Sequence, residues 1–239
     1  MGWSTESGYH QAPCGRIFYR RRAGSGSQLL LIHGLASSSE SWEGLVDELP
    51  KDLDIYAIDL PLHGLSDCKA SSIRDYLAAI ASFAEGKLCA SPYIFGHSYG
   101  GWLAAHYLSS GKTVSGLVLE DPSGLDSHIG AMSDAERERY LLPLLRHKGP
   151  PASRLPSLSE LLLATSSNYL TSGLLGRVKA RTAIVWGEQD GRIPVAHAGR
   201  FGMAIPSASL SVIKGARHTP HRTHPAAVAS VIMNQIGSG

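Results

Sequence analysis

Residues 91–111 read SPYIFGHSYGGWLAAHYLSSG, and this stretch carries the strongest local signal of the fold. Residues 91–97 form a short apolar run typical of a buried strand, and residues 98–111 follow the pattern of a helix that ends at Gly111. Ser98 therefore lies where a strand meets a helix, inside the pentapeptide G-x-S-x-G. This is the setting of a nucleophile elbow, in which a tight turn presents a serine at the edge of a sheet. Because the chain contains 26 glycines, the pentapeptide can also occur in an ordinary turn with a capping serine. The surrounding sequence is needed to distinguish the two interpretations.

Strand-like and helix-like segments alternate along most of the chain. This alternation predicts βαβ units, and hence an α/β fold with a mostly parallel, twisted sheet flanked by helices. The expected strands are residues 17–22, 28–34, 53–60, 91–97, 113–121, 181–187 and 208–215, and the expected helices are residues 39–50, 73–87, 98–111, 195–204 and 225–236.

The alternation is interrupted between about residues 122 and 179, where only helical patterns and loops occur. One helix of this segment is expected to begin with a capping box formed by Ser133 and Glu136. We interpret the segment as a small helical cap inserted over one end of the sheet, and residues 1–239 as a single domain that carries it.

Composition and charge argue against several classes of partner. The net charge of +2 is too small to indicate binding to nucleic acid or to an anionic membrane. No apolar run approaches the ~18 residues of a membrane span, and the N-terminal residues lack the apolar core of a signal peptide. Cys14, Cys68 and Cys89 are widely spaced and odd in number, which indicates neither a disulfide framework nor a metal site. We therefore expect reduced thiols in a cytoplasmic protein without a nucleic-acid or membrane partner.

An acyl-transfer site needs two N–H groups that stabilise a negatively charged oxygen. The N–H of Tyr99 follows Ser98 at the start of the expected helix, where N–H groups point out of the helix end. The N–H of Leu35 is the second candidate, because His33 and Gly34 end an expected strand and lead abruptly into a loop. We expect His33 to order this loop rather than to take part in the chemistry.

A serine nucleophile also needs a histidine base and an acid that orients the base, and in this kind of fold the chain order is serine, acid, histidine. Asp190 follows the expected strand 181–187 in a loop bracketed by glycines, and His218 lies just beyond the last expected strand, 208–215. Both loops should lie at the carboxyl edge of the sheet, where Ser98 is also expected. We therefore predict that Ser98 is the nucleophile, Asp190 the acid and His218 the base, with no cofactor.

Other residues in the same loops remain alternatives for these roles. The histidines that follow the last expected strand lack an accompanying acidic residue, so we expect no metal site. His63 and His97 are expected to be structural. The alternatives are Glu188, Glu120 and Asp121 for the acid, and His221 and His224 for the base.

In their order and spacing these motifs resemble the α/β-hydrolase fold superfamily, and within it the serine hydrolases of the carboxylesterase kind. The resemblance runs from about Ile17 to Ile236 outside the helical insertion, and it implies the triad and the two oxyanion donors named above. The chain departs from the pattern at Leu62, where many relatives carry arginine. A serine rather than an aspartate nucleophile argues against haloalkane dehalogenases and epoxide hydrolases of this fold. The stretches that carry the resemblance are LLIHGLASSS (30–39), AIDLPLHGLSD (57–67), GHSYGG (96–101), WGEQDGRIP (186–194) and GARHTPHRTHP (215–225).

We expect a serine hydrolase that cleaves a small or medium ester through an acyl-enzyme intermediate, so that the partner is a small-molecule ester. A thioesterase, a lactonase, a carbon–carbon bond hydrolase or a perhydrolase would use the same triad, and a non-catalytic ligand-binding receptor could share the fold. The sequence predicts no oligomeric state. Apolar residues near the expected site are candidates to line the substrate pocket, although the two tryptophans among them also fall on core faces of helices. These candidates are Trp42, Trp102, Leu141, Leu145, Leu162 and Ile193.

Overall fold

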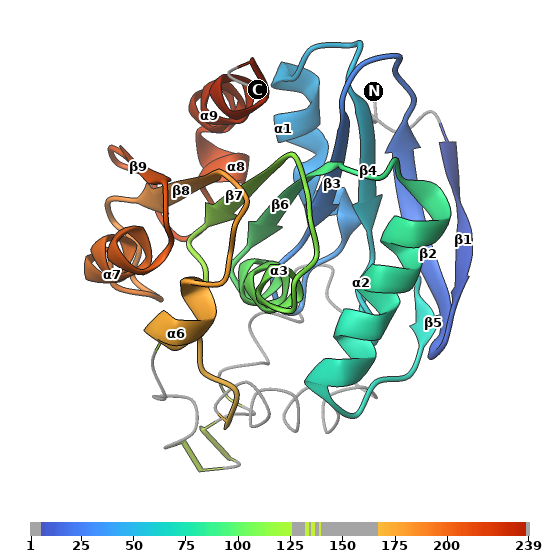
Figure 1. The fold of residues 1–239 in the computed structure, drawn as a ribbon, viewed down its shortest axis with the longest axis horizontal. Helices are drawn as coiled ribbons and strands as arrows, with labels where there is room; N and C mark the ends of the chain where they lie inside the picture. Colours follow the sequence, from blue (N-terminus) through green and yellow to red (C-terminus); the bar gives the residue numbers. More distant parts are fainter. Residues whose placement is uncertain (1–5, 126–131, 134, 137–138, 140–166, 238–239) are drawn as a thin grey trace.

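A computed structural model of the 239-residue chain describes residues 6–125, 132–133, 135–136, 139 and 167–237. Within these residues the strands form one sheet in the order β1-β2-β4-β3-β6-β7-β8-β9, with the short strand β5 paired to β2 (Figure 1). The strands are β1 (Glu6–Ala12), β2 (Gly15–Arg22), β3 (Gln28–Ile32), β4 (Asp54–Ile58), β5 (Asp67–Cys68), β6 (Tyr93–His97), β7 (Gly116–Glu120), β8 (Thr182–Gly187) and β9 (Ala208–Ile213).

The sheet is parallel from β4 to β9, whereas β1, β2 and β5 join it in antiparallel pairs. This confirms the expected α/β fold with a mostly parallel sheet flanked by helices. The described helices are η1 (Ser39–Trp42), α1 (Glu43–Glu48), α2 (Ile73–Lys87), α3 (Tyr99–Ser109), α6 (Ser172–Leu175), α7 (Ala196–Ala204), α8 (Pro220–Thr223) and α9 (Pro225–Gly237).

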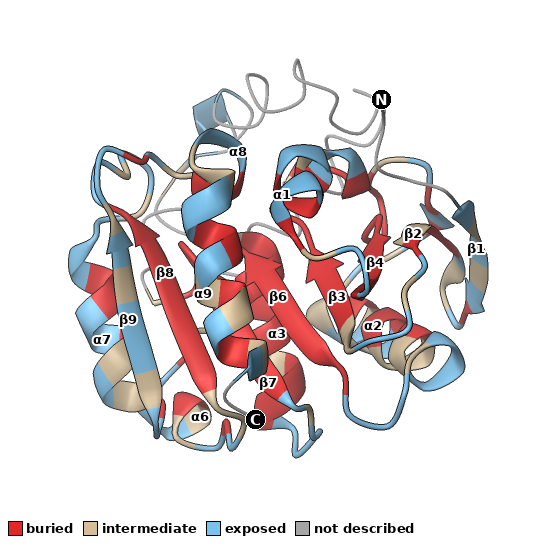
Figure 2. Ribbon diagram, turned by 90° about the horizontal axis from the view of Figure 1, so that it is seen from above, coloured by how far each residue is buried: buried red, intermediate tan, exposed pale blue. Residues whose placement is uncertain are grey.

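Two hydrophobic cores hold the helices against the two faces of the sheet. On β3 the side chains of Leu30 and Ile32 join the core under α2, α3 and α7, whereas Leu29 and Leu31 join the core under α1 and α9. Successive strand residues point to opposite faces, so a strand covered on both sides must be apolar throughout. Figure 2 shows the result: strands such as β3, β6 and β8 are buried along their length, while β9 at the edge is partly exposed.

The expected helical insertion lies between β7 and β8, and the structure describes only part of this segment. The capping box at its start is confirmed, because the Ser133 N–H and hydroxyl both donate to Glu136 Oε2 at 2.7 Å. The helix α6 lies near the end of the segment and contacts α3 and α7. Residues 140–166 lie outside the described residues, and the cap with its bounds of about 122–179 stays a prediction.

The expectation of three reduced cysteines is wrong in this structure. Cys14 and Cys68 form a disulfide, with 5.1 Å between their Cα atoms, and only Cys89 is a free, exposed thiol. The two cysteines are 54 residues apart in sequence, and they meet because β5 pairs with the start of β2. The number of cysteines and their spacing in the sequence cannot reveal such a tertiary contact. The disulfide also removes the cysteine argument for a cytoplasmic location, which stays a prediction.

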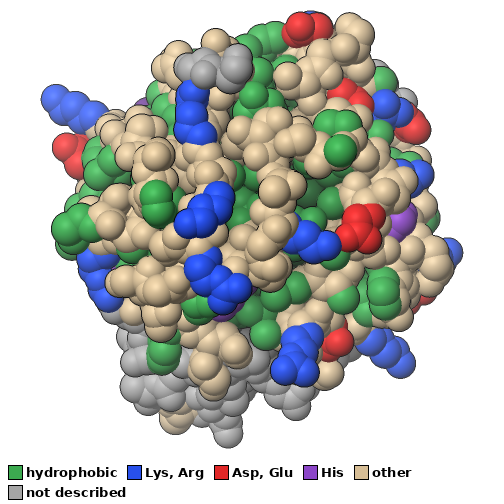
Figure 3. Space-filling model, in the orientation of Figure 1, with side chains coloured by type: hydrophobic (Ala, Val, Ile, Leu, Met, Phe, Trp, Pro, Cys, Tyr) green, Lys and Arg blue, Asp and Glu red, His purple; other side chains and the backbone are tan. Residues whose placement is uncertain are grey.

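The helices and the charged surface of the protein are relevant to the expected absence of membrane and nucleic-acid partners. Among the described helices, none combines the length and apolar character that crossing a membrane requires. On the face shown in Figure 3, Lys and Arg side chains are separated from one another by other side chains instead of gathering into one basic patch. The absence of nucleic-acid and membrane partners stays a prediction.

Candidate active site

Ser98 occupies a strained turn between β6 and α3. Its backbone has φ 50° and ψ −112°, a conformation that residues with a side chain rarely adopt. The Ser98 N–H donates to the carbonyl oxygen of Glu120 at 2.9 Å, which fixes the turn against β7. Strain of this kind persists only where the surrounding structure imposes it, and it is typical of a nucleophile elbow.

Glycines allow the strand and the helix on either side of Ser98 to approach closely. A Cβ atom on Gly96 would lie 2.6 Å from the carbonyl oxygen of Gly100, and a Cβ atom on Gly100 would clash with the carbonyl oxygen of Ile32 on β3. Both obstacles are backbone atoms, which cannot rotate away. The glycines of the pentapeptide are therefore required by packing.

A matched pair of Gly→Ala variants tests this requirement. Gly100→Ala is expected to lower the free energy of unfolding by about 3 kcal/mol, because the helix must move off the sheet. Gly199→Ala makes the same change in α7, where a Cβ atom meets nothing within 4 Å, and should raise stability by about 0.5–1 kcal/mol. Guanidinium denaturation of both variants measures the difference. Equal stabilities would show that the elbow tolerates a side chain at Gly100.

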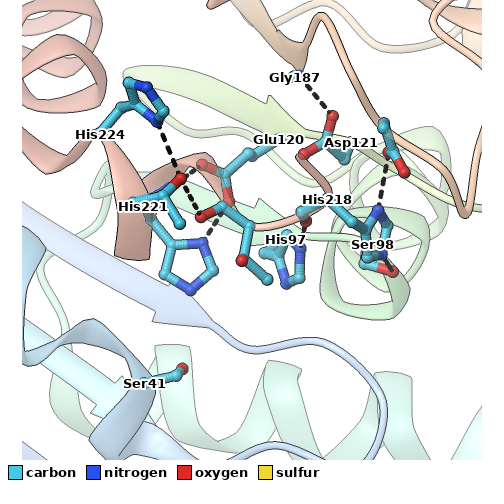
Figure 4. A network of polar contacts seen from close by, with 12 residues as sticks. Ser41, His97, Ser98, Glu120, Asp121, Gly187, His218, His221 and His224 are labelled. Carbon is cyan, nitrogen blue, oxygen red and sulfur yellow. Dashed lines mark hydrogen bonds and ion pairs between the residues drawn. The ribbon is translucent and has the colours of Figure 1, made fainter. Parts of the chain in front are cut away.

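Three side chains from distant loops meet in series at the carboxyl edge of the sheet. The Oγ atom of Ser98 lies 3.0 Å from Nε2 of His218 (Figure 4). Nδ1 of His218 lies 2.8 Å from Oδ2 of Asp190. Ser98 follows β6, Asp190 follows β8 and His218 follows β9, so the parallel strands of one sheet bring all three to its carboxyl edge. A hydroxyl, an imidazole and a carboxylate in this order can pass a proton from the serine to the histidine.

Asp190 is held in the geometry of an ionised carboxylate. Its side chain is fully buried, and Oδ1 accepts the backbone N–H groups of Arg192 at 2.7 Å and Ile193 at 3.0 Å. Burial opposes ionisation, but the hydrogen bond and the charge of His218, together with the two N–H groups, outweigh it and lower the pKa of Asp190. The remaining oxygen is aimed at His218 and fixes which ring nitrogen carries the proton.

The alternative residues make other contacts. Glu188 accepts the Gly215 N–H, and His224 contacts the hydroxyl of its neighbour Thr223. Glu120 pairs with His221: Oε1 accepts the His221 N–H at 2.7 Å, and Oε2 lies 2.5 Å from Nδ1 of the ring. Among the described residues, Asp190 is thus the carboxylate bonded to the ring of His218.

The loop after β3 lies directly against Ser98. A Cβ atom on Gly34 would lie 3.3 Å from the Cβ of Ser98, so the backbone that leads to Leu35 passes beside the nucleophile. Tyr99 is the first residue of α3, where helix N–H groups point out of the helix end. Both N–H groups are in the segments that an oxyanion hole requires, and their role stays a prediction.

His33 orders the loop after β3, as expected. Its Nδ1–H donates to the carbonyl of Gly34 at 2.7 Å, and Nε2 accepts the N–H of Leu60 at 3.0 Å. Complete burial lowers the pKa of His33 to about 4, so the ring is neutral at physiological pH and bridges two loops.

A buried polar network behind His218 was not singled out in the sequence. His97 Nε2 donates to the carbonyl oxygen of His218 at 2.7 Å, and the ring of His97 packs between those of His218 and His221. Burial, and then the charges of neighbouring groups, hold the pKa values of His97 and His221 well below the usual range. The network anchors the loop that carries His218. Its only sequence signal is the pair Glu120–Asp121, two charges that end a buried strand.

Histidine and acidic groups gather here closely enough to raise the question of a metal. Among the described residues, His97, Glu120 and His221 form one such group, and His97, Asp121 and His218 form another. In both groups each histidine has at least one ring nitrogen that already bonds to a carboxylate, carbonyl or hydroxyl oxygen. The expectation of no metal stays a prediction.

The expected pocket residues fall in different places. Trp42 is fully buried in the core under α1 and packs on Phe95 and His221. Trp102 is fully buried on α3, where its Nε1–H donates to the carbonyl of Asn168. Ile193 lies in the Asp190 loop, partly exposed. Leu141, Leu145 and Leu162 lie outside the described residues, and the pocket stays a prediction.

Comparison with known proteins identifies the family. The model of the alpha/beta hydrolase family matches residues 29–231. The chain is 26% identical over 238 residues to the dihydrolipoyllysine-residue acetyltransferase component of the acetoin cleaving system of Cupriavidus necator, covering 85% of this chain and 62% of that protein's length. It is 24% identical over 263 residues to monoacylglycerol lipase ABHD6 of Homo sapiens, covering 92% of this chain and 78% of the lipase.

Solved structures agree on the fold. A thermophilic esterase from Thermogutta terrifontis superposes with a TM-score of 0.81 at 18% identity, covering 98% of this chain and 99% of the esterase. The family match spans most of the chain, including the elbow at Ser98 and the loops of Asp190 and His218. The chain therefore belongs to the alpha/beta hydrolase family.

Proposed function

We propose that this protein is a serine hydrolase that cleaves a small or medium carboxylic ester through an acyl-enzyme intermediate. The observation that carries the proposal is the unbroken series of contacts from the Ser98 hydroxyl through His218 to Asp190. The positive φ of Ser98 supports it, because a capping serine would not need a strained backbone. The relatives support the reaction class, since an esterase and a lipase both act on esters.

The geometry supports a two-step reaction. His218 removes the proton of Ser98 as Oγ attacks the ester carbonyl, and Asp190 stabilises the imidazolium that forms. The N–H groups of Leu35 and Tyr99 stabilise the tetrahedral oxyanion, and each such donor lowers the barrier by about 3 kcal/mol. The imidazolium then protonates the leaving alcohol. In the second step His218 activates a water that releases the acid from Ser98.

A substrate panel tests the proposal. We expect turnover of p-nitrophenyl acetate and butyrate, with lower kcat/KM for long acyl chains and for matched thioesters and lactones. The Ser98→Ala protein serves as control for background hydrolysis. A preference for the thioester or the lactone would reassign the substrate class while keeping the triad. No turnover of any member, by a protein that binds the esters, would favour a ligand-binding receptor.

The value of kcat/KM on an ester should rise with pH between pH 5 and pH 8. The rate rises with pH as the base loses its proton, because only a neutral imidazole can accept the proton of Ser98. The buried rings of His33, His97 and His221 do not contribute, since their lowered pKa values keep them neutral over this range. Initial rates on p-nitrophenyl acetate give the profile. A flat profile would contradict the role of His218.

A further inference from the structure

The carboxyl group of Asp121 lies behind the relay and has no role in the steps above. Asp121 directly follows β7, and its backbone has φ 42°, in the left-handed region. Its N–H donates to the carbonyl of Val185 at 3.0 Å, and its Oδ1 accepts the N–H of Gly187 at 2.9 Å. The residue is fully buried. The strained backbone thus turns the carboxyl group toward the loop that carries Asp190 (Figure 4).

The second oxygen of Asp121 has an unusual environment. Oδ2 is shielded from solvent, and within the described residues no N–H or O–H group donates to it. An oxygen of the Asp121 carboxyl group lies within 4.8 Å of a ring nitrogen of His218, the residue to which Asp190 bonds. The carboxyl groups of Asp121 and Asp190 are close enough for a hydrogen bond between them to act on the ionisation of Asp121. Two buried carboxylates side by side repel each other, so one of them must carry a proton.

The hydrogen bonds decide which of the two is protonated. Asp190 accepts two backbone N–H groups on Oδ1 and meets His218 with Oδ2, which favours its charged form. From the described residues, the side chain of Asp121 accepts only the Gly187 N–H. Burial, then the charge of Glu120 and the bond to Asp190, raise the pKa of Asp121 to about 9, whereas the pKa of Asp190 is lowered.

We propose that Asp121 is a positioning residue that stays protonated in the folded protein and donates a hydrogen bond from Oδ2 to the carboxylate of Asp190. This bond holds Asp190 against Nδ1 of His218 and withdraws electron density from the carboxylate. The proposal rests on the proposed function, because it concerns the acid of that relay. Asp121 itself does not touch the substrate or the reacting atoms.

The charged and titratable groups around Asp121 fit this arrangement. They come from every neighbouring element: His97 ends β6, Glu120 ends β7, and His218 and His221 follow β9, in addition to Asp190. His97 and His221 are neutral, and Glu120 faces His221. A neutral Asp121 adds no negative charge next to His218, and Asp190 is the carboxylate that bonds to the ring.

The variant Asp121→Asn distinguishes a protonated from an ionised Asp121. Its amide keeps an acceptor for Gly187 and a donor toward Asp190, and it has the shape of the carboxylic acid. We expect kcat/KM within about threefold of wild type. The acidic limb of the profile, where kcat/KM rises with pH, should lie at the same pH as in wild type. If Asp121 were ionised, the change would remove a negative charge near the imidazolium and move the limb to lower pH. Such a shift would overturn the proposal.

The variant Asp121→Leu removes the donor while filling the space. Asp190 then becomes a stronger acceptor for the imidazolium, so the acidic limb should move to higher pH, and kcat should fall about tenfold with little change in KM. Glu188→Gln is the matched control, because it removes an exposed carboxylate from the same loop and should leave the limb in place. A limb unchanged in Asp121→Leu would show that Asp121 does not act through Asp190.

Thermal unfolding gives an independent readout. A carboxyl group whose folded pKa is raised contributes stability at low pH and loses it as pH rises from the unfolded value of about 4 toward the folded value. The asparagine side chain of the Asp121→Asn variant does not titrate, so the Tm of this variant minus that of wild type should increase steadily from pH 5 to pH 8. A difference that stays constant or decreases over this range would overturn the proposal.

The two hypotheses fail in different ways. A wild-type protein that hydrolyses no ester would refute the proposed function and the positioning role with it. An active wild type whose Asp121→Asn variant shifts the acidic limb, or shows no rise in relative Tm, would refute the positioning role alone.

Discussion

Replacement of Ser98 by alanine is expected to lower kcat on p-nitrophenyl acetate by about 10⁵–10⁶-fold, to the background left by binding and the oxyanion donors. The physical reason is that no other hydroxyl can take the place of Oγ, which meets Nε2 of His218 at 3.0 Å. The free energy of unfolding should not fall, because the change to alanine removes no packing contact in the core and Ser98 is only half-buried. Steady-state kinetics and a thermal melt on the same preparation measure both quantities.

Ser110→Ala provides the matched control for Ser98→Ala. It makes the same substitution on an exposed residue directly after α3, where the hydroxyl donates to the carbonyl of Tyr107. We expect wild-type turnover from this variant. Residual activity of Ser98→Ala within tenfold of wild type would show that the nucleophile lies elsewhere.

Replacement of Asp190 by asparagine should lower kcat by about 10⁴-fold. The amide nitrogen would donate to Nδ1 of His218, so the ring would carry its proton on Nε2 and could not accept the proton of Ser98. The Oδ1 acceptor for Arg192 and Ile193 can be kept, and the fold should therefore survive. Fixed-time assays at high enzyme concentration measure the residual rate.

Asp121→Asn is the natural comparison for Asp190→Asn, because the same chemical change is made in the neighbouring carboxyl group. We expect a loss of about 10⁴-fold for Asp190→Asn and nearly wild-type activity for Asp121→Asn. A larger loss at Asp121 than at Asp190 would make Asp121 the orienting acid, which is the alternative that the sequence leaves open.

The parts of this structure that could be predicted are those with local signals. The buried strands are continuous apolar runs, as in β3, where side chains enter cores on both faces of the sheet. The turn at Ser98 is marked by glycines that packing requires. Once a parallel sheet is inferred, the loops of Asp190 and His218 must emerge at its carboxyl edge, and the structure brings both side chains to Ser98.

The parts that were missed depend on contacts between distant segments. Strand β1 is polar and half-exposed, because it lies at the edge of the sheet and pairs only with β2. The Cys14–Cys68 disulfide forms only when β5 pairs with β2. The pairing of Glu120 with His221 joins residues 101 positions apart, and nothing in either local sequence points to the other.

Covalent labelling with a fluorophosphonate probe, followed by peptide mapping, tests whether Ser98 is the activated nucleophile, because the probe reacts preferentially with a serine that neighbouring groups activate. We expect one equivalent of probe on Ser98, with esterase activity lost in proportion, and no incorporation in Ser98→Ala. An unlabelled wild-type protein, or a label on another residue while Ser98→Ala still hydrolyses esters, would contradict it.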